Sequence, residues 1–193
     1  DYPAVFGWEL GGLETGADRS IDDVPFAEIT RLLCAAYGRG AVNTVSGHPQ
    51  NPESGASAWD GKTSTAVSSI LPGGANHAQF RLWLDRLAGF FVGLKSADGT
   101  CVPVLFRPFH EHTGSGFWWG EAQCTPDEYK ALWRFTVEYL RDVKGVHNLL
   151  YVYSPDLYRD AEHYTERYPG DEWVDVLGLD AYHRPQDLSL IHI

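Results

Sequence analysis

The sequence lacks any hydrophobic run long enough to cross a membrane. A transmembrane helix needs about 20 mostly apolar residues in a row, and no such stretch occurs among the 193 residues of this chain. Basic residues are also in short supply, because 15 Lys and Arg face 26 Asp and Glu and leave a formal net charge of −11. Nucleic acids and anionic membranes attract basic surfaces, so we expect neither a nucleic acid nor a membrane as a partner.

Cysteine is the next scarce residue, with only three in the chain. Cys34, Cys101 and Cys124 have spacings that fit no zinc-binding pattern. An odd number of thiols cannot all be paired, although one disulfide is possible, so cysteine leaves the redox compartment open. We expect no metal ion and no other cofactor.

Aromatic residues, in contrast, are plentiful, with 7 Trp and 10 Tyr. The flat apolar face of an indole can stack on a pyranose ring while neighbouring polar groups bond to the sugar hydroxyls. Trp side chains clustered beside carboxylates are therefore typical of proteins that bind carbohydrate. A neutral polymer is also compatible with the acidic charge of the chain.

Apolar runs typical of β-strands alternate with amphipathic helical patterns along the chain. We predict strands at residues 4–8, 41–46, 102–106, 149–154 and 174–179. The near-continuous apolar character of residues 102–106 indicates a strand buried on both faces. Strict alternation of strands and helices predicts an α/β fold with a parallel sheet, and the length of the chain indicates a single domain.

The connecting segments carry helix signals and one long loop. Asp22 or Asp23 is expected to cap the first helix, and Asn76 to start another through a capping box. Thr125 and Glu128 form the same pattern at a third helix, with a Pro between them at the first helical position. Residues 47–75, rich in Gly, Ser, Asn and Pro, are predicted to be a loop, and loops of this length are usually functional.

Polar residues of catalytic type follow every predicted strand. In strand order these residues are Glu9, His48, Arg107 with His110 and Glu111, Asp156, and Asp180 with Tyr182. Parallel α/β folds bind ligands at the carboxyl ends of their strands. We therefore expect these side chains to gather at one edge of the sheet.

Among the segments that follow the predicted strands, residues 107–120 are the most informative. Their sequence is RPFHEHTGSGFWWG. Arg107, His110 and Glu111 crowd one strand end, and three consecutive aromatic residues follow within a few positions. A glutamate is rarely buried without a partner. A carboxyl group beside hydrophobic rings has a raised pKa, which suits a general acid.

This segment resembles the motif of glycoside hydrolase family 26, which consists mostly of endo-β-mannanases. Residues 6–14 resemble the family's second-strand region, residues 44–52 its third and residues 175–182 its sixth, so the similarity covers nearly the whole chain in order. Gly116 departs from the pattern, because many members carry another aromatic residue there. That departure puts one sugar-stacking contact, and with it the substrate preference, in doubt.

The resemblance implies a (β/α)₈ TIM barrel that is incomplete in this chain. The family's acid/base Glu ends the fourth strand and its nucleophile Glu ends the seventh. The similarity runs from the second strand to the sixth, so strands one, seven and eight would be missing. No Glu follows Glu172, so the nucleophile would be missing too. Residues 1–193 would then form one partial catalytic barrel, with residues 189–193 as a non-native tail.

The resemblance also implies an activity and a set of roles. The protein would be an endo-acting retaining glycoside hydrolase that cleaves β-1,4-mannosidic bonds, with Glu111 as general acid/base. His110 would orient the site, His48 would contact the sugar on the non-reducing side, and Asp180 would join the same polar cluster. Tyr182 would hydrogen-bond the nucleophile. Trp118 and Trp119 are expected to stack on substrate or to wall off the acid.

The expected partner is a polysaccharide, mannan or glucomannan, bound by a monomer that is secreted or located at the cell surface or in the periplasm. The first residues, Asp1, Tyr2 and Pro3, show no signal-peptide pattern. Because the family also includes enzymes for mixed-linkage glucan and β-1,3-xylan, the polysaccharide itself stays open.

Two other functions compete with this one. In a metal-dependent hydrolase, His110, His112, His48 and Asp180 would converge as ligands. In a non-catalytic carbohydrate-binding protein, the aromatic residues would matter and Glu111 would not.

Four other residues have weaker expected roles. Glu9 and Glu14 are expected to pair with Arg residues, and Asp156 to cap the next helix. Trp59, beside Asp60 in the long loop, is expected either to line a distal sugar subsite or to be structural.

Overall fold

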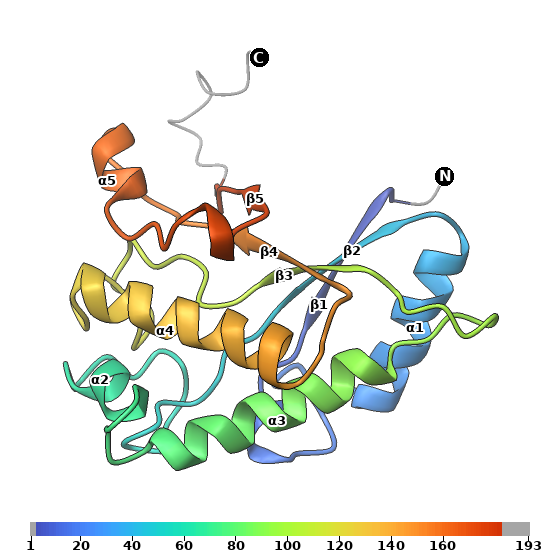
Figure 1. Cartoon of the computed structure of the whole chain (residues 1–193), viewed down its shortest axis with the longest axis horizontal. Coiled ribbons are helices and arrows are strands. Elements are labelled where there is room, and N and C mark those ends of the chain that lie inside the picture. Colours follow the sequence, from blue (N-terminus) through green and yellow to red (C-terminus); the bar gives the residue numbers. More distant parts are fainter. Residues whose placement is uncertain (1–2, 183–193) are drawn as a thin grey trace.

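The computed structural model describes residues 3–182, which form one parallel sheet with helices along it (Figure 1). The strands pair in the order β1-β2-β3-β4-β5, so each strand lies beside the next one in the chain. Their bounds are β1 Val5–Glu9, β2 Val42–Ser46, β3 Val104–Arg107, β4 Leu149–Tyr153 and β5 Val176–Leu177. The predicted parallel α/β fold is confirmed, as an open arc of a barrel.

Helices fill the connections between the strands. The α-helices are α1 Phe26–Gly38, α2 Ala66–Ile70, α3 His77–Gly93, α4 Pro126–Glu138 and α5 Ala161–Thr165. Two 3₁₀ turns, η1 Leu13–Thr15 and η3 Asp171–Trp173, and a π-helical turn, η2 Tyr139–Val143, complete the elements. In the part of the chain described, no helix combines the length and the apolar character needed to cross a bilayer.

Only one of the predicted helix caps forms as expected. Thr125 Oγ1 accepts from the Glu128 amide at 3.2 Å, and the Glu128 carboxylate accepts from the Thr125 amide at 2.8 Å. The cap predicted at Asp22 or Asp23 is wrong, because Asp23 has φ 60° and its carboxylate pairs with Arg19. Asn76 precedes α3 but makes no side-chain cap, since its amide donates to the Ser69 hydroxyl.

Three further expectations about local structure need correction. The stretch 47–75 contains helix α2. Strand β5 has two residues where six were predicted. Strand β3 is not buried on both faces, because Leu105 and Arg107 are only partly covered while Val104 and Phe106 are buried. The five strands do not close around an interior that would cover the second face.

The main hydrophobic core lies between the sheet and helices α3 and α4. Its buried members include Trp83, Leu84, Phe91, Phe106, Leu132 and Trp133. Phe91 of α3 meets Phe106 of β3 edge-on, with ring centroids 5.0 Å apart. Burying side chains of this size stabilises the fold by roughly 1.5–3 kcal/mol each. The core thereby fixes the strand ends from which the polar residues project.

Within residues 3–182, the two outer strands of the sheet, β1 and β5, have a partner on one side only. Val5 of β1 and Leu177 of β5 are among the exposed large hydrophobic residues. A barrel removes such edges by closing. All three cysteines, Cys34, Cys101 and Cys124, are free thiols, so the one disulfide that the sequence allowed does not form.

Candidate active site

An open cleft of about 410 Å³ lies at the carboxyl ends of β2, β3 and β5. Its lining residues are Ser46, His48, Trp59, Arg107, His110, Glu111, Phe117, Asp180, Ala181 and Tyr182. Five residues predicted for the site therefore meet in one place: His48, His110, Glu111, Asp180 and Tyr182. Glu9 and Asp156 lie outside the lining and act on it through neighbours.

The backbone around Glu111 adopts an unusual conformation. Glu111 has φ 54° and Phe109 has φ 47°, on either side of His110. Left-handed φ values are uncommon for residues other than glycine and cost of order 1–3 kcal/mol where the surroundings impose them. The Glu111 amide donates to the Ser154 carbonyl at 2.8 Å, and the Tyr129 hydroxyl donates to the Phe109 carbonyl at 2.9 Å. These bonds hold the turn that presents Glu111 to the cleft.

The surroundings of Glu111 raise the pKa of its carboxyl group. Partial burial is the largest cause, because desolvation penalises the charged form. A hydrogen bond from the Tyr182 hydroxyl to Oε1 acts in the opposite direction, while the negative charges of Asp180 and Asp156 raise the pKa further. A carboxyl group that stays protonated to higher pH is suited to donate a proton.

Tyr182 contacts the acid/base candidate in this chain. The resemblance had assigned its hydroxyl to the nucleophile instead. The pKa of Tyr182 is raised to about 12, chiefly by this hydrogen bond, so the hydroxyl remains a donor at neutral pH.

Asp180 links three strand ends. One carboxylate oxygen pairs with the Arg107 guanidinium, and the other accepts from the Ser154 hydroxyl at 2.8 Å. Its amide donates to the Pro155 carbonyl at 2.9 Å. Asp180 thus lies in the polar cluster that we predicted, and its oxygens are occupied in holding the exits of β3, β4 and β5 together.

His48 is positioned by Glu9, for which we had expected an Arg partner. Within residues 3–182 the Glu9 carboxylate pairs with His48 and with no Arg. Glu9 Oε2 accepts from His48 Nδ1 at 2.8 Å, and Oε1 accepts from the His48 amide at 2.9 Å. A neutral imidazole with its proton on Nδ1 keeps Nε2 as a hydrogen-bond acceptor. The expected Arg pair is wrong for Glu14 as well, because its buried carboxylate accepts from the amides of Gly12 and Gln50.

His110 is buried at the inner wall of the cleft. Burial is the main reason that its pKa falls to about 3, with smaller effects from the charges of His48 and Arg107. The ring is therefore neutral at neutral pH. Its edge meets the His48 ring, with centroids 4.8 Å apart.

Trp118 and Trp119 are fully buried, so the expectation that they stack on a sugar is wrong. Their indole N–H groups donate to the carbonyls of Pro49 at 2.9 Å and His110 at 2.8 Å. These contacts fit the alternative role, a wall behind the acid. The Trp118 amide also donates to the Ala58 carbonyl at 3.0 Å, which fixes the long loop to this wall.

Trp59 presents the accessible indole of the cleft, with 56% of its surface exposed. Its ring lies parallel to that of His48, with 8° between the planes and 5.0 Å between the centroids. The Asp60 carboxylate beside it accepts from the Ser54 hydroxyl at 2.7 Å and so braces the loop. The only sequence signal for Trp59 was its place in the long, polar loop.

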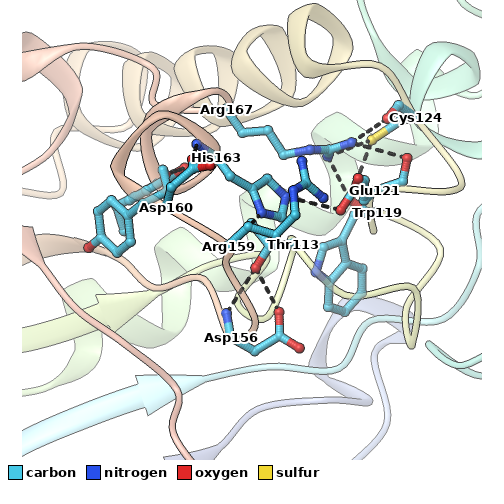
Figure 2. A network of polar contacts seen from close by, with 11 residues as sticks. Thr113, Trp119, Glu121, Cys124, Asp156, Arg159, Asp160, His163 and Arg167 are labelled. Carbon is cyan, nitrogen blue, oxygen red and sulfur yellow. Dashed lines mark hydrogen bonds and ion pairs between the residues drawn. The ribbon is translucent and has the colours of Figure 1, made fainter.

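A polar network supports the motif from behind (Figure 2). The Arg167 side chain is almost fully buried and donates to the backbone carbonyls of Trp119, Glu121 and Cys124. Thr113 exchanges hydrogen bonds with Asp156, through the carboxylate at 2.9 Å and the amide at 3.1 Å. Sequence reasoning missed Arg167, because nothing near it in the chain reveals these partners.

The helix cap predicted at Asp156 is wrong. Asp160 caps α5 instead, because its carboxylate accepts from the His163 amide at 2.8 Å. Asp156 is occupied with Thr113, as the network shows.

His112 does not join the cleft, which contradicts the predicted set of metal ligands. It is fully buried between the rings of Tyr129 and Tyr153, at centroid distances of 4.3 and 4.7 Å. Burial lowers its pKa well below the usual value. Within residues 3–182, no group of three or more His, Cys, Asp or Glu is placed to hold a metal ion.

The architecture and the site together define part of a barrel with a carboxyl group at the mouth. The chain belongs to glycosyl hydrolase family 26, whose family model matches residues 1–191. It is 45% identical over 190 residues to a mannan endo-1,4-beta-mannosidase of Bifidobacterium adolescentis, covering 94% of this chain and 18% of that protein. A mannan endo-1,4-beta-mannosidase of Bacillus subtilis is 32% identical, with 93% of this chain and 50% of that protein covered.

Solved structures agree with this assignment. The GH26 β-mannanase BoMan26A of Bacteroides ovatus superposes with a TM-score of 0.94 at 45% identity, covering 97% of this chain and 54% of that one. A modular endo-β-1,4-mannanase of Cellulomonas fimi gives a TM-score of 0.89 at 41% identity, with 98% and 43% covered. The chain thus spans about half or less of the proteins it matches.

Proposed function

We propose that this chain forms the acid/base half of an endo-acting, retaining β-1,4-mannanase. The observation that carries the proposal is Glu111: a carboxyl group with a raised pKa, presented by a left-handed turn at the exit of β3. Glu111 lines the open cleft, and the aromatic ring of Trp59 lines it as well. The relatives named as mannan endo-1,4-beta-mannosidases support the choice of polymer.

Glu111 acts twice in the proposed reaction. It first donates its proton to the glycosidic oxygen while the bond from that oxygen to the anomeric carbon breaks and the nucleophilic carboxylate attacks the carbon. Glu111, now ionised, then takes a proton from water as the water displaces the nucleophile. Two inversions give net retention, and the second carboxyl group has to lie about 5–5.5 Å from Glu111.

The other residues of the cleft bind and orient the sugar. Trp59 supplies an exposed ring on which a pyranose can stack. His48 Nε2 accepts from a sugar hydroxyl, and neutral His110 packs behind it. Because all these residues come from one chain, we expect a monomer. We expect it to act outside the cytoplasm, where a polysaccharide is accessible.

The test uses the complete-barrel enzyme, by which we mean a polypeptide that carries this sequence within a closed (β/α)₈ barrel. It should release oligosaccharides from β-1,4-mannan, and proton NMR should show the β-anomer first. A panel with glucomannan, mixed-linkage glucan and β-1,3-xylan ranks the substrates. An initial α-anomer, or no activity on any of the four polymers, would contradict the proposal.

The hydrogen bond from Tyr182 to Glu111 gives a pH prediction. This bond stabilises the ionised carboxylate, so removing it in Tyr182→Phe raises the pKa of Glu111 further. A general acid with a higher pKa remains protonated to higher pH. The descending limb of the pH profile of kcat/KM on mannan should therefore move to higher pH. A limb that stays in place or moves to lower pH would show that the bond does not govern the acid.

The exposed and the buried indoles should respond differently to replacement. Trp59→Ala should weaken substrate binding by about 1–3 kcal/mol, as other aromatic stacking platforms do, with little change in the melting temperature. Trp118→Ala should instead cost roughly 3–5 kcal/mol of stability because it leaves a core cavity. Kinetics and thermal melts of both variants separate the two roles. A Trp118→Ala enzyme with a normal melt and weak binding would contradict the assignment.

A further inference from the structure

Asp156 bonds to the segment that carries Glu111. Its carboxylate accepts from the Thr113 hydroxyl at 2.9 Å, and its amide donates to the same hydroxyl oxygen at 3.1 Å (Figure 2). Thr113 is two residues beyond Glu111 in the sequence. The two bonds therefore join the segment after β4 to the segment after β3, close to the proposed acid.

The Asp156 carboxylate also lies against the backbone of Gly114. A Cβ atom on Gly114 would be only 2.5 Å from Asp156 Oδ2, so a side chain at this position would displace the carboxylate. The Gly114 amide donates to the Glu111 carbonyl at 3.3 Å. Asp156 thus contacts Thr113 and Gly114, which complete the turn that begins at Glu111.

The segment after β4 supports this turn at two points. The Ser154 carbonyl accepts from the Glu111 amide at 2.8 Å, and Asp156 bonds to Thr113. The left-handed backbone of Glu111 needs such support, because a residue in this conformation keeps it only where the surroundings impose it. A turn that is fixed on both sides of the carboxyl group holds that group in one orientation.

Charged and titratable groups approach Glu111 from every neighbouring strand exit. They are His48 after β2, Arg107 and His110 on the same segment, Asp156 after β4, and Asp180 and Tyr182 after β5. The two aspartates raise the pKa of Glu111, whereas Tyr182 and His48 lower it. The carboxylates therefore oppose ionisation of the acid, since a like charge disfavours the charged form.

Asp156 differs from Asp180 in the partner of its carboxylate. Asp180 pairs with the Arg107 guanidinium, so a cation beside it offsets its charge. Within residues 3–182, Asp156 forms no ion pair with a Lys, Arg or His, and the hydroxyl of Thr113 that bonds to it is neutral. Replacing Asp156 therefore leaves no cation without its counter-charge.

From these contacts we infer that Asp156 is a positioning residue for the proposed acid/base, because its carboxylate fixes the turn that carries Glu111 and keeps a negative charge near it. The inference rests on the proposed function, since it requires Glu111 to be the acid. Asp156 lies outside the lining of the cleft. It therefore acts through Glu111 and does not touch the sugar.

Asp156→Asn in the complete-barrel enzyme tests the charge. The amide has nearly the shape of the carboxylate, and its oxygen can still accept from Thr113. Without the negative charge, the pKa of Glu111 falls and the acid stays protonated only to lower pH. The descending limb of the pH profile of kcat/KM on mannan should therefore move to lower pH, opposite to the shift expected for Tyr182→Phe.

Asp156→Ala tests the position of the acid. The variant loses the carboxylate bond to Thr113 as well as the charge, so kcat on mannan should fall roughly 10- to 100-fold, the scale of a misplaced catalytic group. An activated aryl β-mannobioside needs little protonation of its leaving group. The first step on this substrate, measured as the burst of released aryl alcohol, should stay close to that of the parent enzyme. A merely structural role would lower both rates together.

Asp142→Asn is the matched control, because Asp142 is an exposed aspartate that precedes β4, whereas Asp156 follows it. Its charge lies toward the other end of the strand, so the pH limb and both rates should match the parent enzyme. A limb that stays in place or moves to higher pH in Asp156→Asn, or equal losses on the two substrates in Asp156→Ala, would overturn the inference.

If Asp156→Ala does not fold, the pH limb of Asp156→Asn decides alone. A parent enzyme that hydrolyses no β-mannan would instead refute the proposed function, so the two failures are distinguishable.

Discussion

Replacing Glu111 by Gln in the complete-barrel enzyme should lower kcat on mannan about 10²–10⁴-fold, the range of a lost general acid. The amide cannot protonate the glycosidic oxygen. It has nearly the same shape as the carboxyl group and can still accept the hydrogen bond from Tyr182. Steady-state kinetics on mannan measure the loss, and circular dichroism checks that the fold is kept.

Activated aryl glycosides distinguish the loss of the acid from a general loss of activity. Their leaving groups need little protonation, so the first step of Glu111→Gln should be nearly as fast as in the parent enzyme. The second step should remain slow, because no base activates the water. An enzyme with unchanged kcat on mannan, or with equal losses on both substrates, would contradict the role of Glu111.

Residues 1–193, expressed alone, should be poorly soluble and inactive on mannan. The described sheet has two unpaired edges, at β1 and β5, with Val5 and Leu177 exposed on them. Open strand edges with apolar side chains favour association between chains. Hydrolysis with retention also needs a second carboxylate. The family resemblance assigns this role to a Glu at the end of the seventh strand, and the sequence has no Glu after Glu172.

Size-exclusion chromatography, thermal melting and a mannan assay test this expectation. The complete-barrel enzyme is the positive control in each. A soluble monomer of residues 1–193 with a cooperative melt would show that the closing strands are not needed for folding. Mannan turnover that disappears in its Glu111→Gln variant would show that the second carboxylate is within this sequence.

The arrangement of the sheet and the gathering of the site were predictable because both follow from general rules. Alternating strands and helices give a parallel sheet, and the ends of parallel strands meet at one edge. His48 and Asp180 are 132 residues apart in sequence, yet this rule places both beside Glu111. The direction of the Glu111 pKa shift was also predictable, because a carboxyl group near apolar rings is desolvated.

The depth at which each aromatic ring lies was not predictable from residue type. For Trp118 and Trp119 the family resemblance implied one of two roles, stacking on substrate or walling off the acid. Their N–H groups find carbonyl partners, Pro49 being 69 residues away, and both rings become core. Within residues 3–182 the Trp59 indole N–H makes no hydrogen bond, and the side chain stays at the surface. Tertiary hydrogen bonds therefore determine which of these Trp rings is buried and which is exposed. A local sequence pattern does not contain that information.

The predicted helix caps that do not form are absent for a related reason. A cap residue competes for every other polar partner that the fold brings near it. Asp23 pairs with Arg19, and Asn76 donates to Ser69. Thr125 does cap α4, because its partner Glu128 lies only three residues further along the chain. This capping box therefore needs no tertiary contact.

The left-handed backbone at Phe109 and Glu111 costs conformational free energy, which other interactions in the fold have to offset. Neither an aromatic residue nor a glutamate favours positive φ, whereas glycine and asparagine do. Residues chosen only for stability at these two positions would therefore differ from those present. The segment thus gives up conformational stability for the fixed position of the proposed acid/base carboxyl group, a local instance of the trade-off between stability and activity. We therefore expect substitutions that relax this turn to stabilise the fold and to displace the proposed acid.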